Sequence, residues 1–143
     1  MSGFAEVSDT LWRERELLDL LLFKLDSERL LLRAGSVRWL ARSTHELDLV
    51  LEQIQLVEIT RALEVDALAA QLGLASGATL SDLAAVAPTP WKELFHAHRA
   101  AFRTLIDEVT ALAEANQQAL RGACVTSERN LATLRSATFQ VQV

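Results

Sequence analysis

The sequence predicts an all-α protein, an elongated antiparallel bundle of three long helices with a short helix in the crossover. Its five glycines and two prolines stand at positions 3, 35, 73, 77, 122, 88 and 90, so the stretches 4–34 and 36–72 contain neither residue. Glycine weakens a helix through its backbone entropy, and proline lacks a backbone donor and clashes with the preceding turn. Long stretches without either residue, with apolar side chains repeating every three or four positions, are typical of amphipathic helices.

Length and composition indicate one domain over residues 1–143, because the chain can build one hydrophobic core but hardly two. The net charge of -5 and the lack of a Lys/Arg-rich stripe argue against a nucleic-acid partner. The leucine-rich start is interrupted by charges well before the ~20 apolar residues that cross a bilayer, so we expect no membrane insertion. A single cysteine, Cys124, and an amino terminus without a basic signal region suit a cytoplasmic location.

A first helix is predicted over residues 10–34. This segment is rich in Leu, Glu, Arg and Lys, which lose little rotamer freedom in a helix, and Ser8 or Asp9 is a candidate cap. Its apolar stripe is wide, so we expect the helix to contact two neighbours. The stripe consists of Leu11, Leu18, Leu22, Leu25 and Leu32, widened by Leu17, Leu21 and Leu31.

A second helix is predicted over residues 36–72, with Gly35 ending the first helix and Ser36 as the cap of the second. The two-residue junction favours antiparallel packing of the two helices, and the alternative is a kink in one very long helix.

A crossover and a last helix complete the pattern. Thr79 and Asp82 resemble a capping box ahead of a short helix over 80–86, and Pro90 suits the first position of a helix over 90–136. That last helix either ends at Gly122 or continues through it at a cost of ~1 kcal/mol relative to alanine. Residues 138–143 are expected to form a frayed tail.

Enzyme chemistry is not indicated by any motif. Glu93, His96 and His98 are the only clustered metal-ligand types, and the two histidines lie ~200° apart around a helix, so they cannot hold one ion together. The sequence has no nucleophile elbow and no phosphate-binding glycine pattern, so we predict no catalytic residue, no metal and no cofactor. We expect the three tryptophans to close the ends of the bundle, with interface anchors as the alternative. They are Trp12, Trp39 and Trp91.

The apolar stripes exceed what three helices of unequal length can cover for each other. An uncovered stripe on a soluble protein usually marks a binding surface, so we predict capture of another helix. That helix comes either from a second copy or from a different protein.

Several segments resemble the FlgN-type flagellar export chaperones of high-GC Gram-positive bacteria, and the likeness covers most of the chain. The first is the leucine-rich run 11–25, followed by Arg38-Trp-Leu-Ala-Arg42 and Val50-Leu-Glu-Gln-Ile54. Near the end, the segments 112–120 and 129–134 are similar to the family's pattern of an asparagine, a leucine one turn later and a closing leucine repeat.

The resemblance implies a cytoplasmic chaperone of the flagellar type III export apparatus, with the hook-filament junction proteins FlgK and FlgL as cargo. The family binds a carboxy-terminal amphipathic helix of its cargo with the later part of its own last helix. Carried over by position, the candidate cargo surface consists of Ile106, Val109, Ala113, Asn116, Leu120, Leu131 and Leu134. The alternative function is a self-associating structural bundle, a homodimer or coiled-coil adaptor without cargo.

Overall fold

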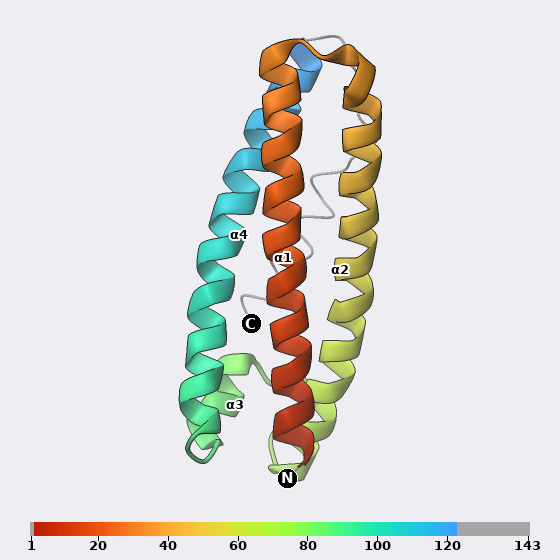
Figure 1. Ribbon diagram of the computed structural model, residues 1–143. Coiled ribbons are helices and arrows are strands. Elements are labelled where there is room, and N and C mark those ends of the chain that lie inside the picture. Colours follow the sequence, from red (N-terminus) through yellow and green to blue (C-terminus); the bar gives the residue numbers. More distant parts are fainter. Residues whose placement is uncertain (1, 123–143) are drawn as a thin grey trace.

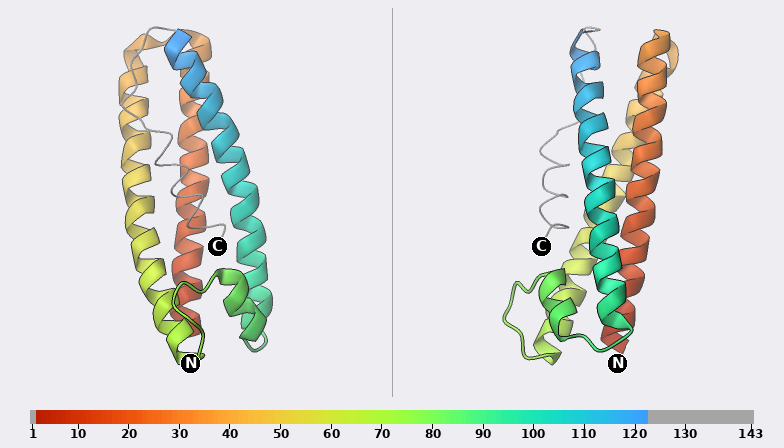
Figure 2. Two further views of the ribbon diagram at one scale, coloured as in Figure 1. Left: turned by 180° about the vertical axis from the view of Figure 1, so that it is seen from behind. Right: turned by 90° about the vertical axis from the view of Figure 1, so that its left-hand side faces the viewer.

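The computed structural model describes residues 2–122, which form three long helices and one short helix (Figure 1). They are α1 (Ser2–Ala34), α2 (Val37–Gln71), α3 (Leu80–Val86) and α4 (Trp91–Gly122). Helices α1 and α4 run in the same direction and α2 runs in the opposite one (Figures 1 and 2). Helix α3 lies in the crossover, at the end of the bundle that holds the amino terminus. The predicted all-α bundle with a short crossover helix is confirmed.

Helix α1 is the central helix and packs against both α2 and α4, as its wide stripe predicted. Its buried residues alternate at spacings of three and four from Phe4 through Val7 and Leu11 to Leu25. Because this seam already includes Phe4 and Val7, the helix begins at Ser2 and not near residue 10. The predicted cap Ser8 is inside the helix, with its Oγ 3.3 Å from Nε2 of His98.

The junction between α1 and α2 is a tight turn. Gly35 has a φ of +66°, a left-handed conformation that favours glycine, and Ser36 N donates to Leu31 O at 3.0 Å. The chain therefore reverses here, so the hairpin prediction is right and the long kinked helix is wrong. Among the described residues, the Ser36 side chain makes no capping hydrogen bond, so its predicted capping role is wrong.

The crossover follows the predicted capping signal. Thr79 N donates to Asp82 Oδ2 and Asp82 N donates to Thr79 Oγ1, both at 2.9 Å, which is a complete capping box for α3. Leu80, Leu83 and Ala84 of α3 are buried in the same core as α4. The crossover thus places the start of α4 beside the start of α1.

Helix α4 begins at Trp91, whose ring stacks on Phe4 of α1 with the centroids 6.0 Å apart. The expected closing role of tryptophan applies to this residue alone, because Trp12 and Trp39 are 47% and 46% exposed. The described part of α4 reaches Gly122. The remainder of the predicted helix to residue 136, and the predicted tail 138–143, lie outside the described residues.

Candidate functional site

A shallow, open groove runs between α1 and α4. Its wider part has a volume of about 770 Å³ and is apolar over most of its lining. Four residues of each helix form it: Asp19, Leu22, Phe23 and Asp26 of α1, and Glu108, Ala111, Leu112 and Ala115 of α4. Phe23 forms a bulky side of this hollow and is 63% exposed.

The groove continues toward the start of α1 as a second hollow of about 480 Å³. Asp19 lines both hollows, so the two are adjacent. The second hollow is lined by Trp12, Arg15, Glu16 and Asp19 of α1, and by Ala101, Thr104 and Leu105 of α4. Measured along α1 from Trp12 to Asp26, the groove is about 21 Å long at 1.5 Å per residue. This length suits about four turns of a bound helix.

Small side chains on one flank of α4 create this groove. Ala101, Thr104, Ala111 and Ala115 stand beside the buried seam of α4 and leave room between the helices. On the α1 side the lining includes large side chains such as Trp12, and these form the outer edge of the groove. The groove therefore has a low apolar floor beside a bulky edge, the shape in which an amphipathic helix can lay its apolar face.

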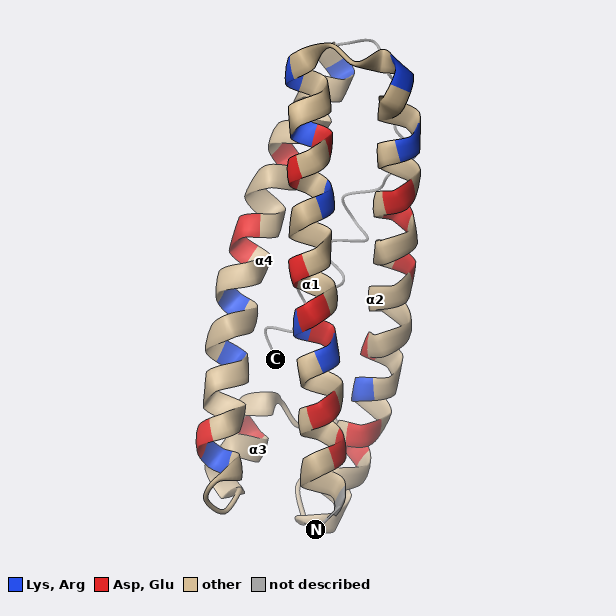
Figure 3. Cartoon of the chain, viewed as in Figure 1, with Lys and Arg blue, Asp and Glu red and all other residues tan. Residues whose placement is uncertain are grey.

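The charged residues along the groove are mainly acidic. Its lining includes four carboxylates, Glu16, Asp19, Asp26 and Glu108, against one guanidinium, Arg15. Figure 3 shows Asp and Glu positions as red segments along the ribbons of α1 and α4. Asp26 is partly neutralised, since its Oδ1 lies 2.7 Å from Nη2 of Arg29. A guest helix with Lys or Arg beside its apolar stripe would complement this charge.

At the end of the groove nearer the start of α4, a polar contact fixes α4 against α1. Oγ of Ser8 and Nη1 of Arg15 each lie 3.3 Å from a ring nitrogen of the buried His98. Burial lowers the pKa of His98 to about 4, and the charge of Arg15 adds to the effect, so the ring is neutral. Because a guanidinium can only donate, Nδ1 accepts from Arg15 and the proton lies on Nε2, which donates to Ser8.

At the other end of the groove, nearer the end of α4, Asn116 makes the corresponding contact. Its Nδ2 donates to Leu25 O at 2.8 Å and to Glu28 Oε1 at 3.0 Å, both on α1. Thr44 of α2 donates to the other oxygen of Glu28 at 2.9 Å. Glu28 therefore connects all three long helices, and the parallel register of α1 and α4 is held at both ends of the groove.

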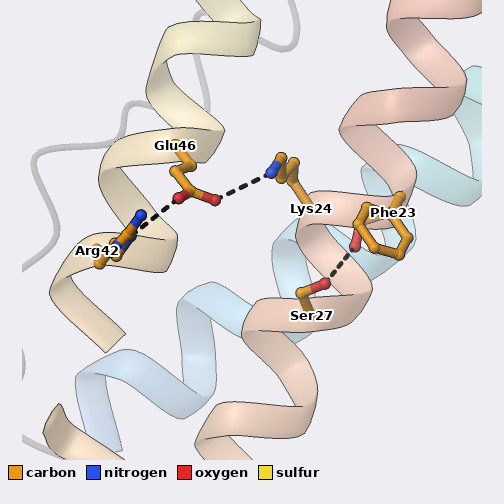
Figure 4. Close-up of polar contacts among 5 residues, drawn as sticks. All are labelled: Phe23, Lys24, Ser27, Arg42 and Glu46. Atoms are coloured by element: carbon orange, nitrogen blue, oxygen red, sulfur yellow. Dashed lines mark hydrogen bonds and ion pairs between the residues drawn. The ribbon is translucent and has the colours of Figure 1, made fainter. Parts of the chain in front are cut away.

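Lys24 ties α1 to α2 on the side away from the groove. Its Nζ lies 2.9 Å from Oε1 of Glu46, whose other oxygen accepts from Arg42 Nε at 3.2 Å (Figure 4). These two hydrogen bonds lower the pKa of Glu46. The ring of the preceding residue, Phe23, lies away from α2, and its carbonyl oxygen accepts from Ser27 Oγ at 3.0 Å. The Phe23 ring, with Lys24 Nζ 6.0 Å from its centroid, therefore stays exposed on the groove side.

Comparison with protein-family models gives one decisive result: the FlgN protein family matches residues 1–142. The chain belongs to the FlgN family. The family consists of flagellar export chaperones and not of enzymes, as the sequence resemblance implied. Comparisons with the curated proteins and with the solved structures give no match.

The cargo surface expected from the FlgN resemblance does not lie open. Five of its residues are at most 4% exposed: Ile106, Val109, Ala113, Asn116 and Leu120. The expectation of an exposed stripe at these positions is wrong, because they occupy the alternating three-and-four seam of α4 that packs against α1. Leu131 and Leu134, the other two predicted residues, lie outside the described residues.

The sequence analysis did not predict that the residues of α4 beside this seam line a groove. The sequence did contain a signal for this flank. Three small residues of α4, Ala101, Ala111 and Ala115, lie beside the seam positions. Of the two FlgN-like segments near the chain end, the first, 112–120, contacts α1 and contributes Leu112 and Ala115 to one wall of the groove.

Other classes of site find little support within residues 2–122. No group of three or more His, Cys, Asp or Glu side chains in this part of the chain is arranged to hold a metal ion. His98, one of the histidines considered as a ligand, instead bonds to Ser8 and Arg15. None of the described helices combines the length and apolarity needed to cross a membrane.

Proposed function

We propose that this protein is a cytoplasmic export chaperone for the hook-filament junction proteins FlgK and FlgL, and that it delivers them to the flagellar export apparatus. In this proposal it holds the carboxy-terminal amphipathic helix of its cargo in the groove between α1 and α4. The observation that carries the proposal is the groove itself, apolar along its floor, acidic along its edges and about 21 Å long. Membership of the FlgN family supports the general role.

The energetics fit temporary capture. A guest helix would cover Leu22, Phe23, Ala111, Leu112 and Ala115, and each Å² of apolar surface removed from water contributes about 25 cal/mol. Ordering a flexible cargo terminus costs ~2 to 5 kcal/mol of that gain. The complex hides the cargo's polymerising surface and still dissociates at the export apparatus.

The residues carried over from the FlgN resemblance keep a place in this proposal. Ile106, Val109 and Asn116 hold α4 in position beside α1 and so form the support of the groove wall. We retain Leu131 and Leu134 as proposed cargo contacts.

The test is calorimetric titration with peptides that correspond to the carboxy-terminal helices of FlgK and FlgL from the same genome. We expect wild-type binding, and a loss of at least tenfold in affinity for Phe23→Asp and for Ala111→Arg, which obstructs the groove. Leu63→Asp on α2, which replaces a residue 67% exposed, and Glu114→Arg, at an exposed position on the other flank of α4, are controls that keep wild-type affinity.

Two results would count against this assignment. If neither peptide binds the wild-type protein, the cargo proposal is lost and the structural-bundle alternative is favoured. If the peptides bind equally well to Phe23→Asp and Ala111→Arg, the cargo site lies elsewhere on the protein.

A further inference from the structure

Helix α2 carries apolar side chains on two opposite faces. One face is buried against the rest of the bundle and includes Leu47, Leu51, Ile54 and Leu68. The other faces outward and consists of Leu49, Leu56, Ile59 and Leu63, with exposed fractions of 44%, 66%, 60% and 67%. At 100° per residue, the centre of the second set lies about 180° from the centre of the first. We call these four outward residues the α2 ridge.

The surface around the α2 ridge is uncharged over three turns. Between positions 53 and 63 the only charged residues are Glu58 and Arg61, and both are buried on the opposite face. The remaining exposed residues of this stretch are Gln53, Gln55, Thr60 and Ala62. A helix that only faces water ordinarily carries charges there, so a continuous neutral and apolar strip indicates a protein contact. The groove between α1 and α4 does not include any residue of α2.

We propose that the α2 ridge binds the same ridge of a second copy of this chain, with the two α2 helices antiparallel and Leu56 on the twofold axis. The three leucines of the ridge are seven residues apart, so a twofold axis at Leu56 places Leu49 opposite Leu63 of the second copy. The surface is therefore self-complementary, as an isologous dimer requires. This inference goes beyond the proposed cargo function and does not rest on it.

Charge selects the antiparallel arrangement. In a parallel pair, Glu52 and Asp66 would each face their own copies, which is unfavourable for like charges at helix contacts. In the antiparallel register, Glu52 instead comes level with Thr60 of the second copy. Arg42, whose side chain is 71% exposed, comes level with Ala70 of the second copy, one turn from its Asp66. The same register brings Asp48 level with Glu64 of the second copy and Glu46 level with its Asp66, so the advantage over the parallel pair comes from Glu52 and Arg42 alone.

The size of the contact sets its strength. From Leu49 to Leu63 the ridge is about 21 Å long, so one helix from each copy forms a contact at the low end of specific interfaces. We therefore expect a dissociation constant in the micromolar range, roughly 1 to 100 μM. The dimer would leave both grooves between α1 and α4 accessible.

Sedimentation velocity over a concentration series tests the association. The wild type should shift from monomer to dimer, and Leu56→Glu should weaken association by about a hundredfold or more, because the twofold axis brings the two introduced carboxylates against each other. Phe23→Glu is the matched control, since Phe23 is 63% exposed but lies on α1, and it should dimerise normally. Circular dichroism verifies that each variant keeps its helicity.

Disulfide cross-linking in a Cys124→Ser background tests the register. Leu56→Cys should cross-link to itself, and a mixture of Leu49→Cys with Leu63→Cys should give a mixed dimer while neither variant cross-links alone. Dimers of Leu49→Cys alone and of Leu63→Cys alone would indicate parallel helices and overturn the proposal, as would a wild type that stays monomeric at all concentrations. Loss of cargo-peptide binding in Leu56→Glu, with an unchanged oligomeric state, would overturn it too, by assigning the ridge to cargo.

Discussion

A buried carboxylate in the contact between α1 and α2 makes stability depend on pH. Glu14 is 0% exposed, and its Oε1 lies 3.3 Å from Nε of Arg61. Within residues 2–122, neither Glu14 oxygen accepts a hydrogen bond, so the ion pair is poorly aligned. Glu58, 5% exposed, shares the same guanidinium. Two buried carboxylates with one buried cation leave one negative charge without compensation when both are ionised.

Burial is the main cause that raises the pKa of Glu14 from 4.5 to about 7, with Arg61 opposing it and Glu58 adding to it. The folded protein therefore holds a proton that the unfolded chain has released between pH 4.5 and 7. The contribution of this proton to the free energy of unfolding is fully present below pH 4.5 and is lost as the pH rises through 7. At about 1.4 kcal/mol per pKa unit, Glu14 alone makes the protein roughly 2 to 3 kcal/mol less stable at pH 8 than at pH 5.

Replacing Glu14 by Gln keeps the shape and removes the charge. Glu58 and Arg61 then form a neutral pair, so we expect Glu14→Gln to be more stable than the wild type at pH 8 by roughly 1 to 3 kcal/mol. At pH 5, where Glu14 is already protonated, the two proteins should be nearly equal.

Urea unfolding followed by circular dichroism at pH 5 and pH 8 measures this difference. Glu16→Gln, which neutralises an exposed carboxylate two residues away, is the control and should follow the wild type at both pH values. A Glu14→Gln protein that is less stable than the wild type at pH 8 by about 3 to 5 kcal/mol would show that Glu14 forms a stabilising ion pair with Arg61, and would refute the reasoning.

Three further substitutions test how the helices are held together. Asn116→Ala should cost about 1 to 3 kcal/mol in urea unfolding, because it removes the buried hydrogen bonds that Asn116 donates to Leu25 O and Glu28 Oε1, whereas Gln118→Ala on the exposed face of α4 should cost less than about 0.5 kcal/mol. Phe102→Ala should cost about 3 to 5 kcal/mol, since the ring is fully buried, and a smaller loss would mean that the core collapses around the gap. Gly35→Ala should lower the melting temperature through a loss of about 1 kcal/mol, caused by its φ of +66° alone, because a Cβ there meets no atom within 4 Å; no change would show that the turn relaxes.

Helix positions could be predicted from the sequence because they depend on local pattern. The breaker Gly35 and the capping box at Thr79 each act within a few residues, and both appear where the pattern placed them. The start of α1 was missed because Ser8 looks like a local cap, whereas its hydroxyl is hydrogen-bonded to His98 of α4. A residue whose partner is distant in sequence gives no local signal.

The groove between α1 and α4 was harder to predict for a related reason. Periodicity shows that one face of α4 is apolar, but it does not show which helix covers that face. Ile106 and Leu120 have the character of a binding stripe, and the structure uses them to attach α4 to α1. The groove exists only where the flanks of two parallel helices meet, with Phe23 on one side and Ala111 on the other.

The polar contacts at the two ends of the groove fix the register of its two walls. His98 lies just before Ala101, where the groove begins on α4, and Asn116 lies just after Ala115, where it ends. Each binds α1 through buried hydrogen bonds that are satisfied only in one register. Apolar contacts alone would allow α4 to slide by a turn and would bring different side chains into the groove. Under the proposed function, a groove fixed in this way imposes little ordering cost on the chaperone, so the main entropic cost of binding falls on the cargo helix.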